Sequence, residues 1–556
     1  MEGKRLTEPK QMTKILHSVR NIHNLKELLN SSYQLYPNHL AFKYKAADRS
    51  TIVTKTYTNL KQDVDALGTS LLHLGLKNKK IIVISNNRYE WCVSYLATVN
   101  GVGTIVPFDR LLPEEELINL VKKTNPSCIL FEEKFTSLLE SLKEQLPQIE
   151  YLISFEQAED SASVLSYSLL IEKGKQLLQQ GYTDYVTALI DDDSPTTMIY
   201  TSGTTSTSKA VLLTPKNIAF DIVACAQVVK YYDTDTLLSF LPIHHTFECT
   251  ATFLLGLYSG SCIAFCDGMK SIVPNLKEYE VSVFLAVPLV LETIYKSIMK
   301  ASQDKKIPPT AILKNLAPNL RLFIVGAASI DKEIVIGFNQ LGIKAYQGYG
   351  LTEASPVVSV ENDSFRKPGS IGRLLPGIQG KIVDPDEEGI GEIVIKSPTV
   401  MLGYCNNPEA TNEVLKDRWL YTGDLGYFDE EDNLYITGRK KSVIVLKNGK
   451  NVFPEEIESV INNCPYILES FVYSTKRKTD SEQLCAKIVY NQDYFTEKYG
   501  TITEEQKREI IHQYLKEVNK TLPLYKYIRD FSLTTEPLIK TTTNKIKRYE
   551  EWKKIS

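Results

Sequence analysis

Short apolar runs alternate with helical patterns through most of the chain, and this alternation limits the fold more than any other feature. Runs at 81–85, 104–108 and 127–131 are rich in β-branched residues and have the length of buried strands, and helical patterns fill 89–99 and 113–123 between them. Strands separated by helices in this way pair in parallel, with the helices as crossover connections. The sequence therefore predicts an α/β fold with a mostly parallel sheet flanked by helices.

Two later stretches interrupt this pattern. A polar, acidic stretch at 156–194 predicts a connection between subdomains. After residue 436 the pattern of strand and helix signals changes, which predicts a small α+β domain. In that domain the pair Asn448-Gly449, between two apolar runs, is typical of a two-residue hairpin turn. Thr503 and Gln506 form a capping box that predicts the start of a helix. Its apolar residues follow helical spacing: Ile510, Ile511, Tyr514, Leu515, Val518 and Leu522.

Length and charge narrow the class of protein. A chain of 556 residues with 43% hydrophobic content exceeds one ordinary core, so two or more domains are expected. The 64 basic and 67 acidic side chains nearly balance, which argues against nucleic acid as a partner and for a small molecule. The longest apolar run, 281–291, is too short for a membrane span, and the first residues lack the apolar stretch of a secretory signal. Nine scattered cysteines are typical of reduced thiols. We expect a cytoplasmic protein, with peripheral membrane contact and oligomeric state left open.

The stretch YTSGTTSTSKAVLLT at 200–214 has the polarity of a phosphate-binding loop but few glycines. A P-loop requires a hydroxyl residue directly after its lysine to hold magnesium, whereas Ala210 follows Lys209 here. Hydroxyl groups such as those of Thr204 and Thr205 can still donate to phosphate oxygens, and a lysine can supply charge. On its own the stretch fits a polar turn equally well.

A second motif favours the phosphate interpretation. In YQGYGLTEASP at 346–356, a glycine-rich turn presents an aromatic ring, a hydroxyl and a carboxylate, which can stack on a base, touch a phosphate and bind a hard cation. YTGDLG, GRKKSVIVLKNGKNVFPEEIE and IKTTTNKIKR follow at 421–426, 438–458 and 539–548. Taken in order, these motifs resemble the adenylate-forming superfamily of acyl-CoA synthetases, luciferases and peptide-synthetase adenylation domains. LPIHHTFE at 241–248 is similar to the bacterial fatty acyl-CoA synthetases.

The resemblance implies a fold. A large N-terminal AMP-binding domain at 1–438 would hold mostly parallel sheets flanked by helices and a smaller β-subdomain. A small mobile α+β domain would follow at 439–556, with a hinge near Lys441. The resemblance also implies ATP, Mg²⁺ and coenzyme A as cofactor and co-substrates.

It also implies site residues. The phosphates would contact Thr201, Ser202, Gly203, Thr204, Thr205 and Lys209. The adenosine would contact Gly326, Ala327, Ala328, Gly348, Tyr349, Gly350, Asp424 and Arg439. Tyr349 would stack on the adenine, and the Asp424 carboxylate would hold the ribose hydroxyls. The catalytic set would be Lys545 and Thr352 at the α-phosphate, Glu353 on Mg²⁺ and His245 near the carboxylate. Gly449 would line the thiol channel.

The implied reaction has two steps. A carboxylate attacks the α-phosphate of ATP to give acyl-AMP and pyrophosphate, and a thiol, most often that of coenzyme A, then displaces AMP. A medium- or long-chain fatty acid is the expected acid. Phe253, Leu254, Leu255 and Leu257 would line an acyl tunnel or, more simply, form helix core. Two alternatives stay open: a free-standing enzyme that loads a carrier protein, with Glu248 near the position of an amine-pairing acid, and a catalytically impaired nucleotide-binding protein.

The chain departs from the family pattern at four positions. Ser206 and Ala210 stand where glycine is usual, Ser208 replaces proline, and Asn544 replaces the glycine before the terminal lysine. Serine and alanine would each cost about 1 kcal/mol if the backbone there has positive φ. These losses of glycine are the support for the impaired alternative.

Overall fold

The computed structural model describes residues 14–201, 208–326, 330–446, 451–476, 482–541 and 546–555. Its first sheet has eight strands, and those from β8 to β7 run parallel, as the alternating pattern predicts. In spatial order the strands are β19 (Gly403–Tyr404), β9 (Lys209–Leu213), β8 (Thr197–Thr201), β4 (Thr104–Pro107), β3 (Lys80–Ile84), β5 (Cys128–Phe131), β6 (Tyr151–Ser154) and β7 (Val164–Ser166). The helices α3 (Tyr89–Ala97) and α4 (Glu114–Thr124) are the predicted crossovers.

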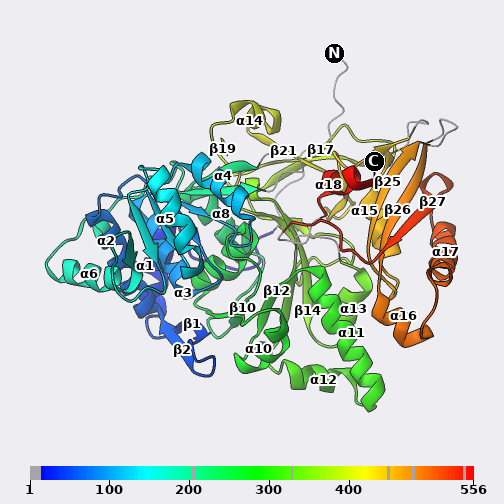
Figure 1. Ribbon diagram of the computed structural model, residues 1–556, viewed down its shortest axis with the longest axis horizontal. Helices are drawn as coiled ribbons and strands as arrows, with labels where there is room; N and C mark the ends of the chain where they lie inside the picture. The colour runs from blue at the N-terminus through cyan, green and yellow to red at the C-terminus, as the bar shows by residue number, and fades with distance from the viewer. Residues whose placement is uncertain are drawn as a thin grey trace.

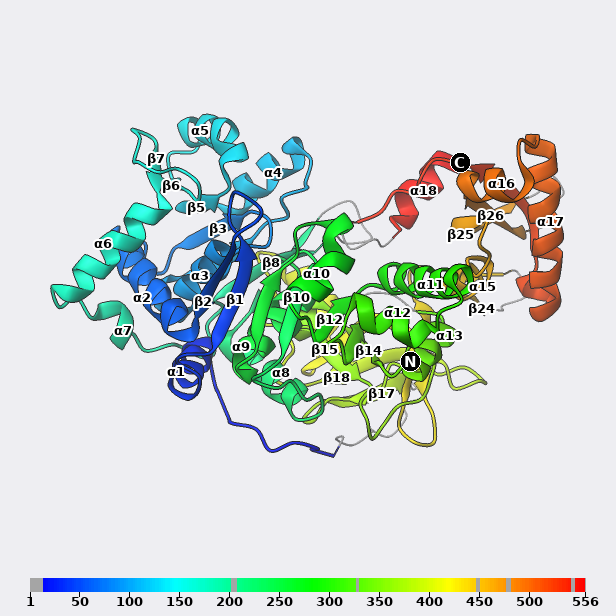
Figure 2. The ribbon, with the colours of Figure 1, turned by 90° about the horizontal axis from the view of Figure 1, so that it is seen from below.

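The polar stretch at 156–194 is not a plain connection, and that prediction is wrong. It contains β7, α6 (Tyr167–Gln179) and α7 (Asp184–Thr187). The side chain of Ser166 caps α6, and Leu170 and Ile171 are buried on its inner face. Its polar residues lie on the opposite face, so the average composition concealed an amphipathic helix. The helix α6 lies beside α2 (Tyr57–His73) in both ribbon views (Figures 1 and 2).

The second sheet has nine strands, of which the six from β14 to β1 run parallel. In order they are β16 (Arg373–Leu374), β15 (Val357–Val360), β14 (Lys344–Gly350), β13 (Leu322–Val325), β12 (Val283–Ala286), β10 (Thr236–Ser239), β11 (Cys262–Phe265), β1 (Leu40–Lys45) and β2 (Ile52–Thr56). Further helices of this part of the chain are α1 (Leu25–Leu35), α5 (Thr136–Gln145), α8 (Pro215–Ala226), α10 (Ile272–Glu278), α11 (Pro288–Lys305), α12 (Pro309–Leu316) and α13 (Lys332–Gln340). No helix in the described ranges is long and apolar enough to cross a membrane.

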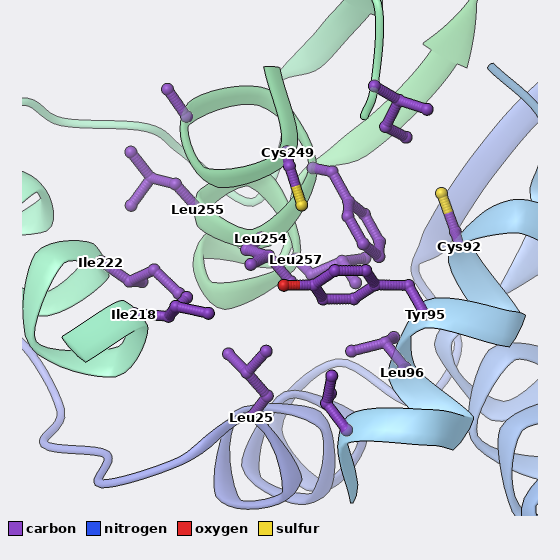
Figure 3. Packing of buried hydrophobic residues seen from close by; sticks show 14 of the residues in the cluster. Leu25, Cys92, Tyr95, Leu96, Ile218, Ile222, Cys249, Leu254, Leu255 and Leu257 are labelled. Carbon is purple, nitrogen blue, oxygen red and sulfur yellow. The ribbon is translucent and has the colours of Figure 1, made fainter. Parts of the chain in front are cut away.

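The largest core lies between the two sheets. It is filled by α3, α8, the π-helical segment η3 (Glu248–Leu254) and α9 (Leu255–Ser259). In Figure 3, Tyr95 of α3 points at the helical segment that carries Cys249 and Leu254, with Ile218 of α8 on the other side. These side chains are almost completely buried. The core therefore fixes η3, which begins shortly after the histidine pair, at Glu248.

A third, antiparallel sheet follows, as expected for the smaller β-subdomain. Its strands are β17 (Gln379–Val383), β18 (Gly391–Lys396), β21 (Trp419–Phe428), β20 (Leu415–Lys416) and β22 (Leu434–Arg439), with β22 paired to β21. The helix α14 (Pro408–Val414) precedes β20.

The C-terminal part has its own core, formed by residues between Val452 and Phe531. Its sheet contains β25 (Ile467–Lys476), β26 (Glu482–Tyr490) and β27 (Ile528–Thr534), and its helices are α15 (Pro454–Ile461), α16 (Gln492–Tyr499), α17 (Glu504–Thr521) and α18 (Arg548–Ile555) (Figure 2). The capping box at Thr503 and Gln506 is present. The predicted α+β character is confirmed, while the boundary at residues 438 and 439 stays a prediction.

The predicted hairpin forms, but with a different register. β23 (Ile444–Val445) and β24 (Asn451–Val452) are antiparallel, and Val445 is opposite Asn451. A two-residue turn at positions 448 and 449 would place Val445 opposite Val452 instead. The described pairing therefore differs by one residue from the expected turn, since an Asn-Gly pair also fits longer connections. Residues 447–450 themselves lie outside the described ranges.

Candidate active site

β8 and β9 carry the two ends of the predicted phosphate loop. They pair antiparallel with Thr201 opposite Lys209, and Thr201 Oγ1 donates to the Lys209 carbonyl over 3.4 Å. Ala210 is buried within the same ladder, opposite Tyr200, and its φ is not positive. The backbone penalty considered for an alanine at this position is therefore absent. Ser206 belongs to the part of the loop that the structure does not describe.

A tight turn after β14 presents Thr352 and Glu353. A Cβ atom on Gly350 would lie 2.1 Å from the carbonyl oxygen of Pro356, so the chain folds back here only because residue 350 has no side chain. Thr352 and Glu353 open the short 3₁₀ segment η5 (Thr352–Ala354). Thr352 Oγ1 lies 3.5 Å from Thr246 Oγ1, beside the histidine segment. The turn thus brings two distant motifs together.

Asp424, Arg439 and Tyr349 form one group. Asp424 and Arg439 are opposite each other on β21 and β22, and Arg439 Nε lies 2.8 Å from Asp424 Oδ1. Tyr349 Oη donates to Asp424 Oδ2 over 2.6 Å. The Asp424 carboxylate raises the pKa of Arg439, while burial and then this carboxylate raise the pKa of Tyr349. The group therefore holds a protonated phenol and a guanidinium around one carboxylate.

The histidine pair has unequal environments. The side chain of His244 is only 12% exposed, and removal from water lowers its pKa to about 4, so the ring is neutral near pH 7. Its Nε2 lies 3.7 Å from Asp109 Oδ2. The ring of His245 lies 5.0 Å from that of His244 and lines the central cavity. Of the two, His245 is therefore placed to meet a ligand.

These groups line one cavity of about 1570 Å³. The predicted site residues on its wall are Thr201, Lys209, His245, Gly326, Gly348, Tyr349, Gly350, Thr352, Glu353, Arg439 and Lys441. Asp424 reaches it through its bonds with Tyr349 and Arg439. Eight predicted residues lie outside the described ranges: Ser202, Gly203, Thr204, Thr205, Ala327, Ala328, Gly449 and Lys545.

Glu353 is the predicted magnesium ligand. Among the described residues, no group of three or more His, Cys, Asp or Glu side chains is arranged to hold a metal ion. Mg²⁺ is commonly held by one or two carboxylates together with substrate phosphates, rather than by a cage of protein groups. A single carboxylate on the wall of a cavity that Lys209 also lines fits this mode of binding.

Sequence reasoning missed Tyr404 and left Glu248 without a firm role. Tyr404 donates from Oη to Glu353 Oε1 over 2.8 Å, yet the pair GY at 403–404 carries no distinctive pattern. Glu248 is fully buried on the cavity wall, and its Oε2 accepts from Thr252 Oγ1 over 3.0 Å. A carboxylate within an otherwise apolar helical run was the available signal for it.

Comparison with known proteins identifies the family. The pattern of the AMP-binding enzyme family matches residues 30–405. The chain is 29% identical to luciferin 4-monooxygenase of Photinus pyralis, with 82% of each chain covered. It is 26% identical to the long-chain-fatty-acid–CoA ligase FadD15 of Mycobacterium bovis, over 75% of this chain and 74% of that protein. The anthranilate CoA ligase AuaEII, solved with anthranoyl-AMP, has the same fold, with a TM-score of 0.78, 20% identity, and coverage of 96% of this chain and 97% of that one. The predicted resemblance is confirmed: this chain belongs to the AMP-binding enzyme family.

Proposed function

We propose that this enzyme activates a medium- or long-chain fatty acid with ATP, through acyl-AMP, and transfers the acyl group to coenzyme A. The single observation that carries the proposal is the continuity of the cavity. The cavity that Lys209, Tyr349 and Glu353 line is also lined by apolar residues of α8, η3 and α9, and we call this apolar part of its wall the apolar branch. A nucleotide and a hydrocarbon acid could therefore meet with their reacting ends adjacent.

The apolar branch fits a hydrocarbon. Its wall contains Cys225, Val229, Tyr231, Ala251 and Leu255. The Tyr231 hydroxyl donates to the carbonyl of Ala251 over 3.2 Å, so it does not need a partner from a ligand. Apolar surface removed from water contributes roughly 25 cal/mol per Å², which favours an acid with a long alkyl chain over a small polar one.

The predicted tunnel residues divide between two roles. Phe253, Leu254 and Leu257 are fully buried core and do not border the cavity, as the simpler interpretation held. Leu255 lines the cavity. Glu248 lies on the cavity wall beside this apolar branch, and burial raises its pKa to about 8, so it is mainly neutral near pH 7. A neutral carboxyl group neither repels the substrate carboxylate nor strongly disfavours an alkyl chain.

In the first step, the carboxylate of the acid attacks the α-phosphorus of ATP, the bond to pyrophosphate breaks, and negative charge increases at the α-phosphate. Cations and hydrogen-bond donors there lower the barrier. Thr352 would donate its hydroxyl, Lys209 would hold the phosphates and Lys545 would neutralise charge on the α-phosphate. Mg²⁺, held by Glu353, would supply further charge neutralisation. His245 would border the acid carboxylate.

In the second step, the thiolate of coenzyme A attacks the acyl carbon and AMP leaves. The C-terminal part takes part in this cavity, because Ile546, Lys547 and Arg548 lie on its wall. We assign the thiol approach to the segment that connects β23 to β24 and includes Gly449. A rotation of residues 439–556 about Lys441 would exchange the two faces between the steps.

A panel of acids tests the proposal by ATP–pyrophosphate exchange. The panel contains acetate, hexanoate, decanoate, palmitate, an aromatic acid and amino acids, and active acids are then assayed for AMP release with and without coenzyme A. We expect exchange with decanoate or palmitate, and AMP release that depends on coenzyme A. Exchange with amino acids alone, or AMP release only with a carrier protein, would favour a carrier-loading enzyme. ATP binding without exchange on any acid would favour an impaired member of the family.

A further inference from the structure

A short segment next to the cavity contacts both the phosphate strand and the turn that carries Glu353. β19 pairs antiparallel with β9, and Cys405 N donates to the Ala210 carbonyl over 2.8 Å. At the other end of the segment, Met401 N donates to the carbonyl of Glu353 over 2.9 Å. The backbone at 401–405 therefore fixes the distance between β9 and η5.

The side chain of Tyr404 repeats this connection inside the cavity. It is 8% exposed and lies on the cavity wall. Its Oη donates to Glu353 Oε1 over 2.8 Å, and the ammonium of Lys209 lies 4.8 Å from the centre of its ring. A phenol is protonated near neutral pH, so the Tyr404 hydroxyl is the donor in this hydrogen bond. One ring thus contacts the predicted metal ligand and the predicted phosphate lysine.

The backbone around Tyr404 leaves the ring little freedom. Gly403 has a φ of 148°, and a Cβ atom there would lie 2.8 Å from Thr411 Cγ2. Tyr404 N donates to Thr411 Oγ1 over 2.9 Å, and Thr411 lies in the middle of α14. The residue is held by β9 on one side and by α14 on the other, as a positioning group requires.

We propose that Tyr404 is a positioning residue for the nucleotide and its metal: its hydroxyl orients the Glu353 carboxylate toward the cation, and its ring holds the Lys209 ammonium beside the phosphates. The inference rests on the proposed function, because it takes Glu353 and Lys209 as the groups that meet MgATP. The inference adds that Tyr404 couples the position of Glu353 to that of Lys209. Displacement of Tyr404 would disturb the metal and phosphate contacts together.

A double-mutant cycle on ATP binding tests this role in the absence of any acid, when no reaction occurs. Wild type, Tyr404→Phe, Glu353→Gln and the double variant are titrated calorimetrically with ATP in EDTA and with ATP in excess MgCl₂. Tyr404→Phe removes one hydrogen bond to a charged group, so we expect MgATP to bind about tenfold more weakly, with metal-free ATP changed less than twofold. In the Glu353→Gln background the same substitution should have no further effect on MgATP.

The Lys209 contact has a separate variant. Tyr404→Leu also removes the ring, so it should weaken metal-free ATP binding by about threefold relative to Tyr404→Phe. Equal binding of metal-free ATP by these two variants would overturn that half of the proposal. Tyr346→Phe is the matched control, since Tyr346 Oη also donates to a carboxylate, Asp363 Oδ1 at 2.6 Å, and is not on the cavity wall.

Other outcomes would overturn the role assigned to the hydroxyl. These are unchanged MgATP affinity in Tyr404→Phe, equal weakening with and without Mg²⁺, or full additivity with Glu353→Gln. If Glu353→Gln alone leaves the effect of Mg²⁺ intact, the metal ligand has been misassigned and the proposed coupling to it fails. Failure of the proposed function is recognised separately, as absence of pyrophosphate exchange on every acid of the panel.

Discussion

Asp424 is a buried carboxylate whose charge is balanced by a neighbouring cation and a hydrogen-bond donor. It is 3% exposed, yet it has a guanidinium partner at 2.8 Å and a phenol partner at 2.6 Å. A buried carboxylate without such partners would be costly, and with them it becomes a fixed acceptor. Tyr349 and Arg439 lie on the wall of the cavity, and the position of Asp424 between them fits the role of holding ribose hydroxyls.

Asp424→Asn should therefore weaken ATP binding. The substitution keeps the shape but removes the charge that orients Arg439 and that would accept hydrogen bonds from the ribose. Because hydrogen bonds to charged groups contribute about 1.5–3 kcal/mol, the KM for ATP should rise at least about tenfold. Steady-state pyrophosphate exchange measures the effect. Asp363→Asn, which also loses a tyrosine partner, is the control, and an ATP KM equal in the two variants would contradict the assignment.

Glu248 predicts a pH dependence of stability. Burial raises its pKa from 4.5 to about 8, so the folded protein holds this proton over a range where the unfolded chain has lost it. The contribution to the free energy of unfolding is fully present below about pH 4.5 and is lost as the pH rises toward 8. Thermal melts of wild type and Glu248→Gln between pH 5 and 8.5 should show wild type losing stability relative to the variant. Parallel curves would exclude a raised pKa.

Contiguous motifs predict Tyr349, Asp424 and Arg439 as site residues, and the structure brings these three into contact. Tyr404 could not be found in this way, because its contact with Glu353 joins residues 51 positions apart and depends on how β19 pairs with β9. Their roles toward ATP stay predictions, since proximity alone does not establish function.

At the level of elements, strands and crossover helices were predictable because their apolar periods are strong. The helix α6 was not, since its polar outer face dominates its composition. Its packing depends on Gly174, where a Cβ atom would lie 1.9 Å from the backbone oxygen of Ala66 in α2. The two helices thus pack with backbones close together, which a composition average does not reveal.

Gly174→Ala should therefore separate α6 from α2. Overpacking of a close contact typically costs about 1–3 kcal/mol, so the free energy of unfolding should fall by that amount. Lys173→Ala, on the exposed side of the same helix, should leave it nearly unchanged. Denaturant unfolding of both variants measures the difference. Equal stability of the two would mean that the helices can shift at no cost.

For the whole molecule, the C-terminal part matters because it reaches the cavity while keeping a core of its own. Arg548, in the first turn of α18, forms ion pairs with Glu455, at 3.0 Å, and with Glu458, both on α15. The segment after Lys545 is thereby joined to the helix that follows the β23–β24 hairpin. Two predicted active-site segments are therefore joined to the same C-terminal core.

This arrangement predicts that the two steps of the reaction can be separated by substitution. Lys545 and Gly449 lie outside the described residues, but the segments that flank them are joined through Arg548. Lys545→Ala removes a cation that stabilises charge in the first step, so adenylation should fall by about 10²–10³ while thioester formation from presynthesised acyl-AMP is spared. Gly449→Leu should do the reverse, because a side chain there would obstruct the thiol.

Each variant is assayed with fatty acid plus ATP, and separately with acyl-AMP plus coenzyme A. Thermal melts accompany both assays, because leucine at a glycine of a turn can also destabilise the hairpin. A folded Gly449→Leu variant that adenylates normally but fails to form the thioester supports alternation of the C-terminal part between two faces. If both folded variants lose both steps equally, one fixed arrangement serves the whole reaction, and the rotation about Lys441 is wrong for this enzyme.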